Sequence, residues 1–192
     1  MSKVTNILLV GVGGQGTVLA SKILGQVAMR LGREVKVAEI HGMSQRGGSV
    51  VTQVRYGEKV YSPTIPKGKA DVILAFEKLE ALRWLPYLAP GGRVIVSDQE
   101  IDPMPVITGQ MQYPEGILEI LEEKSSLLVV PALELAEKAG HRKAANVVLL
   151  GVLARELKSR PGVWRELLVR TVPAHSREVN LKAFQLGLDY QG

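Results

Sequence analysis

The sequence contains no cysteine, and this absence removes several kinds of chemistry at once. A chain without cysteine forms no disulfide, has no thiolate nucleophile and supplies no Cys ligand to zinc or to an iron–sulfur cluster. Aromatic residues are few, at 5% of the chain, and no Lys/Arg cluster accompanies them. Because the base-stacking and phosphate-tracking surfaces of nucleic-acid-binding proteins need such residues, we expect no nucleic-acid partner.

Long hydrophobic runs are also missing. No apolar stretch reaches the roughly 18 residues that a membrane-spanning helix needs. The N-terminal sequence MSKVTNILLVGVGGQG runs directly into a glycine motif and shows no signal-peptide cleavage pattern. We therefore expect a cytoplasmic protein with no membrane partner. His41, His141 and His175 are far apart and lack metal-ligand spacing, so no metal site is predicted.

The composition that is present is that of an ordinary globular protein. The 192 residues are 46% hydrophobic and 22% charged, and they carry a net charge of +5. A chain of this length buries roughly 70% of its unfolded surface, which is enough for a real core. The positive charge suits a phosphorylated ligand or an acidic partner equally well. Since no repeat or linker interrupts the chain, we expect a single domain over residues 1–192.

The hydrophobic pattern predicts an α/β protein with three layers, α/β/α. An apolar strand at 6–10 is followed by a helix from Thr17 and a parallel strand at 35–40. Residues 49–56 alternate as a strand, and a tight turn at 57–58 predicts an antiparallel hairpin with 59–61 in a mostly parallel sheet. Further strands are expected at 71–75, 93–97 and 127–130, helices at 77–88 and 115–123, a surface excursion at 101–114, and a helical C-terminal third from residue 131 in two or three pieces.

A glycine motif, Gly11-x-Gly13-x-x-Gly16, lies between the first strand and the first helix. This placement matches the fingerprint of Rossmann-like dinucleotide-binding folds, in which glycines allow close backbone approach and a helix N-terminus attracts an anion. Glu39 ends the next strand, near the offset expected for a ribose-binding acid. A tight strand–helix turn without a ligand is the alternative. The predicted binding residues here are Gly11, Gly13, Gly14, Gln15 and Gly16.

A second polar segment, His41 to Ser49, follows the second strand at the same predicted sheet edge. Its glycines free backbone donors, and Arg46 carries a planar, permanent charge. The predicted binding residues here are Ser44, Gln45, Arg46, Gly47 and Gly48, and a solvated loop is the alternative.

Residues outside these two segments are predicted to have structural roles. Glu77 and Asn146 are expected to cap helices, and the turn His141-Arg142-Lys143 is expected to be solvated. A stripe at helical spacing is expected to form core or subunit interface; its members are Val147, Leu150, Leu153, Ala154 and Leu157. No catalytic residue is predicted in this chain.

Three segments carry a family resemblance in their order along the chain: GVGGQGTVLASKIL, EIHGMSQRGGSVVTQVRYG and SPTIPKGKADVILAFEKLEALR. They resemble the gamma-subunit/domain family of 2-oxoacid:ferredoxin oxidoreductases, and HGMSQRGG is most similar to the beta subunits of its indolepyruvate branch. The similarity continues through PGGRVIVSDQ to VNLKAFQLG and so covers nearly the whole chain.

The resemblance implies an accessory subunit of a larger enzyme. Such enzymes decarboxylate a 2-oxoacid, here an aryl pyruvate, on thiamine diphosphate, pass electrons through 4Fe–4S clusters to ferredoxin and transfer the acyl group to coenzyme A. Thiamine and clusters then belong to a larger, cysteine-rich alpha subunit, and this chain alone binds no cofactor. The resemblance places residues 11–16 and 44–48 near coenzyme A or the cofactor region, with Lys22 as a phosphate neighbour.

A free-standing NAD(P)- or FAD-binding protein is the competing interpretation, supported by the glycine motif and Glu39. The second segment distinguishes this interpretation from that of an accessory subunit, because a simple dinucleotide-binding chain does not need MSQRGG directly after Glu39. Titration of the chain with NAD(H), NADP(H) and FAD distinguishes them.

Replacing Arg46 tests the second segment. If Arg46 pairs with an anionic ligand, Arg46→Ala lowers the relevant kinetic constant of the assembled enzyme roughly ten- to a hundredfold, because a charged hydrogen bond contributes about 1.5–3 kcal/mol. Arg46→Lys recovers only part, since an ammonium lacks the planar fork. Subunit assembly is measured on the same variants. Lost assembly with normal constants for the remaining complex would show that Arg46 contacts the partner instead.

Overall fold

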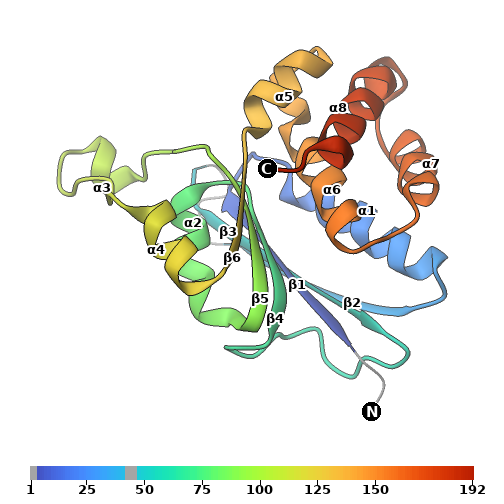
Figure 1. Cartoon of the computed structure of the whole chain (residues 1–192), viewed down its shortest axis with the longest axis horizontal. Coiled ribbons are helices and arrows are strands. Elements are labelled where there is room, and N and C mark those ends of the chain that lie inside the picture. Colours follow the sequence, from blue (N-terminus) through green and yellow to red (C-terminus); the bar gives the residue numbers. More distant parts are fainter. Residues whose placement is uncertain (1–3, 42–46) are drawn as a thin grey trace.

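A six-stranded sheet forms the centre of the chain in the computed structural model, which describes residues 4–41 and 47–192 (Figure 1). The strand order is β2-β3-β1-β4-β5-β6. Strand β3 is antiparallel to both of its neighbours, while β1, β4, β5 and β6 are parallel to one another. The strands are β1 Thr5–Val12, β2 Glu34–His41, β3 Ser49–Gly57, β4 Ala70–Ala75, β5 Leu88–Ser97 and β6 Ser126–Val130.

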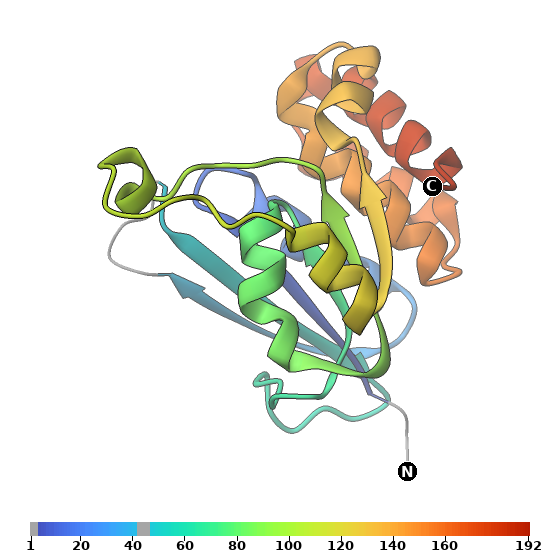
Figure 2. The same cartoon turned by 60° about the vertical axis from the view of Figure 1, so that its left-hand side comes forward.

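Helices cover both faces of this sheet, which confirms the three-layer α/β/α prediction (Figures 1 and 2). Alternate strand residues point to opposite faces, so the central strands contribute to two cores. Leu8, Ile73 and Val94 belong to the core beneath α2 and α4, while Ile7, Leu74 and Ile95 belong to the core beneath α1 and the C-terminal helices. The α-helices that form the layers are α1 Thr17–Arg30, α2 Lys78–Trp84, α4 Ile117–Lys124, α5 Ala132–Ala139, α6 Ala145–Glu156, α7 Pro161–Thr171 and α8 Arg177–Asp189.

The antiparallel hairpin exists, but its partner strand is not the predicted one. Strand β3 pairs with β2, which precedes it, and residues 59–61 form no strand. The reason is that β1 and β2 already occupy both edges of β3. The segment after β3 is held by side chains instead: Arg55 donates to the carbonyls of Ser62 and Thr64, at 2.8 and 3.0 Å.

Several predicted boundaries shift by a few residues. Helix α2 ends at Trp84, a short 3₁₀ turn, η1 Leu85–Tyr87, follows, and β5 begins at Leu88 instead of residue 93. The predicted excursion at 101–114 contains one short helix, α3 Met104–Ile107. The C-terminal third is helical as predicted, but it contains four α-helices, with the further 3₁₀ turns η2 Arg142–Ala144 and η3 Ala174–Ser176.

Helices α6 and α8 approach each other through glycine. A Cβ atom at Gly187 would lie 1.9 Å from the carbonyl oxygen of Val148, and one at Gly151 would lie 2.2 Å from the carbonyl oxygen of Phe184. No side chain fits in either place without displacing backbone. The two glycines therefore set the spacing of these helices over the sheet.

Gly187→Ala forces α6 and α8 apart and should lower the free energy of unfolding by about 1–3 kcal/mol or more. Urea unfolding of the full chain measures this change. Gly162→Ala is the matched control, because no atom lies within 4 Å of its added Cβ. The control should be neutral or stabilising by up to about 1 kcal/mol, since alanine favours a helix. Equal stability of the two variants would contradict the close-contact explanation.

Candidate functional site

The glycine loop between β1 and α1 lies at the carboxyl end of the parallel strands. Gly16 has a φ of 82° and caps α1 without any side-chain hydrogen bond to the helix. Among the described residues no cap side chain accepts from the first N–H groups of α1, and the positive end of the helix dipole lies at the loop. A Cβ atom at Gly11 would lie 3.0 Å from the Cβ of Phe76, so the loop also packs tightly against the segment after β4.

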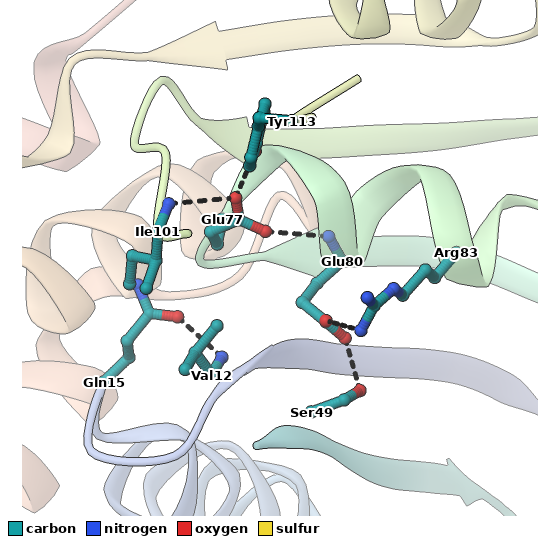
Figure 3. A network of polar contacts seen from close by, with 8 residues as sticks. All are labelled: Val12, Gln15, Ser49, Glu77, Glu80, Arg83, Ile101 and Tyr113. Atoms are coloured by element: carbon teal, nitrogen blue, oxygen red, sulfur yellow. Dashed lines mark hydrogen bonds and ion pairs between the residues drawn. The ribbon is translucent and has the colours of Figure 1, made fainter. Parts of the chain in front are cut away.

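The side chain of Gln15 holds this loop against the neighbouring strands. Its Oε1 accepts a hydrogen bond from the Val12 N–H at 2.8 Å, as Figure 3 shows. Its Nε2 donates to the Phe76 carbonyl at 2.8 Å and to Gln99 Oε1 at 3.0 Å. The amide that we expected to bind a ligand is thus engaged within the chain. Gln15 shapes the loop, and the loop's free backbone groups are left for a ligand.

The two predicted loop segments meet at this edge. The Gly13 N–H donates to the Gly48 carbonyl at 2.9 Å, and the Gly47 N–H donates to the Gly13 carbonyl at 3.4 Å. Ser44, Gln45 and Arg46, also predicted as binding residues, lie outside the described residues, as does the side chain of His41. The structure therefore brings the described end of the second segment against the glycine loop.

A network of buried carboxylates supports the same edge from the side of α2 (Figure 3). Glu77 caps α2 by accepting the Glu80 N–H at 2.9 Å, which confirms the predicted cap. Glu80 is 2% exposed; it accepts hydrogen bonds from the Ser49 hydroxyl and from Arg83. Burial raises the pKa of Glu80, while its contacts with Ser49 and Arg83 oppose that shift. Through this hydrogen bond Glu80 fixes Ser49, the last residue of the second segment and the first residue of β3.

Asn146 has a different role from the predicted helix cap. The N-terminal cap of α6 is Ala144, and no side chain caps the helix. The Asn146 amide instead donates to the Gly16 carbonyl at 3.3 Å, and the residue is buried. It joins the C-terminal helices to the glycine loop across 130 residues of sequence. Since Asn is common in both roles, no local signal separates a cap from this long-range contact.

A cleft of about 470 Å³ opens beside the glycine loop. Gly14 and Gly16 line one side, Ser97 is the last residue of β5 and Gln99 follows it, and Lys143 belongs to the turn before α6. Ser97 is 2% exposed, and its Oγ has no hydrogen-bond partner among the described residues. The described residues that line the cleft carry no carboxylate. They are Gly14, Gln15, Gly16, Phe76, Ser97, Gln99, Leu133, Arg142, Lys143, Ala145, Asn146 and Leu149.

This lining favours an anionic ligand. Arg142 and Lys143 are exposed, as predicted, and both line the cleft; Lys143 brings positive charge to it, while Arg142 pairs with Glu137 at 3.2 Å. The unpaired Ser97 hydroxyl and the N-terminus of α1 add neutral donors. Sequence reasoning missed Ser97 and the position of Arg142 and Lys143, because only the fold brings these segments beside the glycine loop.

Glu39 and Lys22 lie outside this cleft. Glu39 is on β2, which β3 separates from β1, and its Oε1 accepts a hydrogen bond from the Ser21 hydroxyl at 3.1 Å. Lys22 is exposed on α1. His141 and His175 line a separate cleft of about 410 Å³, which also reaches Lys143 and Asn146. The predicted stripe on α6 is core: Val147, Leu150, Leu153 and Ala154 are buried, and Leu157 is partly buried against them.

Two further properties concern only residues 4–41 and 47–192. They hold no group of three or more His, Cys, Asp or Glu side chains arranged to bind a metal ion. None of their helices combines the length and the apolar character needed to cross a bilayer.

Comparison with known proteins gives consistent matches. The model of the pyruvate ferredoxin/flavodoxin oxidoreductase family matches residues 6–190. Indolepyruvate oxidoreductase subunit IorB of Pyrococcus horikoshii is 44% identical over 95% of this chain and 94% of its own, and the subunit IorB of Thermococcus kodakarensis is 42% identical over the same shares. The fold is similar to that of 2-oxoglutarate:ferredoxin oxidoreductase from Magnetococcus marinus, solved with 2-oxoglutarate, coenzyme A and succinyl-CoA bound. That match has a TM-score of 0.75 at 20% identity over 98% of this chain and 31% of that chain.

Gly16→Ala tests the contact between the glycine loop and α6. Its Cβ would lie 2.3 Å from Asn146 Nδ2, whereas a Cβ at Gly14 would meet no atom within 4 Å. Both glycines have positive φ, so both alanine variants carry a backbone strain of about 1–2 kcal/mol, and only Gly16→Ala adds a clash. Thermal unfolding should therefore show a larger loss of stability for Gly16→Ala than for Gly14→Ala. In an Asn146→Ala background the difference in stability loss between the two glycine variants should shrink. If that difference stayed the same, a clash with Asn146 could not be its cause.

Proposed function

Because the chain belongs to the pyruvate ferredoxin/flavodoxin oxidoreductase family, we propose that it is the smaller subunit of an indolepyruvate-type 2-oxoacid:ferredoxin oxidoreductase. The assembled enzyme converts an aryl pyruvate and coenzyme A to the acyl-CoA and carbon dioxide, and ferredoxin takes up the released electron pair. The observation that carries this proposal is the 44% identity to an indolepyruvate oxidoreductase subunit over 95% of the chain. We place this enzyme in the cytoplasm.

The residues of this chain support a division of labour between subunits. The chain has no cysteine, so its side chains cannot hold a Cys-ligated 4Fe–4S cluster. We assign the clusters and thiamine diphosphate to a larger, cysteine-rich alpha subunit, which reduces ferredoxin. Thiamine diphosphate supplies the carbanion chemistry when it is bound there. The small subunit contributes a wall of the active site and no catalytic side chain.

We assign the anion-favouring cleft to coenzyme A. Coenzyme A carries phosphate groups, and phosphate is the type of anion that a helix N-terminus and flanking cations bind. The described residues fit such a group, because Lys143 lines the same cleft as Gly16 at the N-terminus of α1 and the Ser97 hydroxyl has no partner among the described residues. In this assignment the backbone of Gly14 and Gly16 faces the phosphate, while Gln15 and Asn146 keep the loop in shape.

The competing dinucleotide-binding function has less support from the geometry. A ribose-binding acid belongs on the strand beside the glycine loop. Here Glu39 lies on β2, with β3 between β2 and β1, and it accepts a hydrogen bond from α1. Micromolar binding of NAD(H), NADP(H) or FAD to the purified chain would favour this alternative over our proposal.

Reconstitution of the enzyme tests the proposed function. The purified chain, supplied with indolepyruvate, coenzyme A, thiamine diphosphate and ferredoxin, should reduce no ferredoxin. Adding the separately purified alpha subunit should restore ferredoxin reduction that requires coenzyme A. Turnover by this chain alone would refute the division of labour, and failure of the two chains to form an active complex would refute the subunit assignment.

A further inference from the structure

A narrow arm leaves the body of the molecule between β5 and α4. This arm, residues 101–113, carries the short helix α3 and projects on the side away from the C-terminal helices (Figures 1 and 2). The glycine-loop cleft includes none of its residues. The arm therefore needs an explanation other than the one given for the cleft.

Both ends of the arm are fastened to one buried carboxylate (Figure 3). Glu77 Oε1 accepts hydrogen bonds from the Ile101 N–H at 3.3 Å and from the Tyr113 hydroxyl. Burial and the neighbouring Glu77 raise the pKa of Tyr113, so its hydroxyl stays a donor across the physiological pH range. Glu77 is 1% exposed. The base of the arm is thus fixed firmly to α2.

The far end of the arm, which we call the tip, is also ordered by its own bonds. The Thr108 N–H donates to the Met104 carbonyl at 2.9 Å, and the N–H groups of Gln110 and Met111 donate to the Pro105 carbonyl at 2.8 and 3.0 Å. Pro103 and Pro105 fix two further backbone angles. An arm that is ordered before binding loses little conformational entropy when it binds.

The tip presents apolar side chains to solvent. Met104, Ile107 and Met111 are 65%, 66% and 64% exposed, although they are large and lie within eight residues of one another. Single exposed apolar residues are common, but a cluster on a projecting segment is typical of an interaction site. The fold fixes the base of the arm and leaves these three side chains largely uncovered.

The charge around the arm is segregated from that of the rest of the chain. Residues 94–123 contain seven of the 19 acidic residues and none of the 24 Lys and Arg residues. All seven are exposed; they are Asp98, Glu100, Asp102, Glu115, Glu119, Glu122 and Glu123. An apolar tip with an acidic surround complements an apolar pocket with a basic border, and it repels an acidic partner.

We propose that the tip of the 101–113 arm docks into an apolar pocket, bordered by Lys and Arg, on the larger alpha subunit. This inference rests on the proposed function. In the Magnetococcus marinus enzyme the same fold makes up 31% of one longer chain, so a covalent link holds it to the remainder. The IorB subunits of Pyrococcus horikoshii and Thermococcus kodakarensis are matched over 94% of their own length, and a subunit of that kind is held to its partner by a noncovalent surface. The fixed, apolar, acid-flanked arm meets that need.

The test compares two triple variants of the full chain for binding to the purified alpha subunit. The arm variant is Met104→Gln, Ile107→Thr and Met111→Gln. The matched control is Met29→Gln, Val37→Thr and Tyr61→Gln, which changes three exposed apolar residues elsewhere. We expect the arm variant to raise the dissociation constant roughly ten- to a hundredfold and the control to change it less than threefold. Thermal unfolding of each free chain confirms that both variants are folded.

Other outcomes would overturn the proposal. Wild-type affinity of the folded arm variant would do so while leaving the proposed function intact, since the complex would still form. An equal loss of affinity in the control would show that the arm is not special. A wild-type chain that dimerises through the arm, and whose dimer the arm variant breaks without affecting alpha-subunit binding, would identify a second copy as the occupant. Absence of any wild-type complex would instead refute the proposed function itself.

Discussion

The insertion of antiparallel strand β3 between β1 and β2 is the constraint on which the geometry of the site depends. Because Val12 pairs with Ser49 and Gly11 pairs with Val50, the end of the second loop is held directly against the glycine loop. The same insertion moves Glu39 one strand further from the glycine loop, a spacing of about 4.8 Å. The insertion of β3 therefore brings the two loops together and moves Glu39 away from the position that a ribose-binding acid would occupy.

Side-chain amides then fix what the sheet brings together. Gln15 connects the ends of β1, β4 and β5, and Asn146 connects the glycine loop to α6. With these amides engaged, the loop leaves backbone donors at its surface, and Ser97, Arg142 and Lys143 surround the space beside them. The cleft is consequently lined by five separate parts of the chain, and its shape depends on the packing of the C-terminal helices.

The two functional surfaces differ in charge, and this difference fits a subunit with two kinds of contact. The cleft has cationic residues and neutral donors, which suits a phosphate-bearing ligand. Residues 94–123, which include the arm, carry only acidic charge, which suits a basic protein surface. Glu77 links the arm to α2, the helix whose Glu80 also holds Ser49 at the end of the second loop.

Much of this protein was determined by the sequence alone, where short-range rules operate. The apolar strands, the glycine turn into α1 and the cap at Glu77 are local patterns, and the structure confirms them. The ordered segments around GVGGQG and HGMSQRGG also identified the family. Only the tertiary structure decided the partner of β3, the long-range contact of Asn146 and the position of Ser97, Arg142 and Lys143. The physical reason is that these contacts join residues far apart in the sequence, so they exist only after the layers have packed. Before packing, nothing in the local sequence distinguishes an Asn or Arg that will make such a contact from one that stays in solvent.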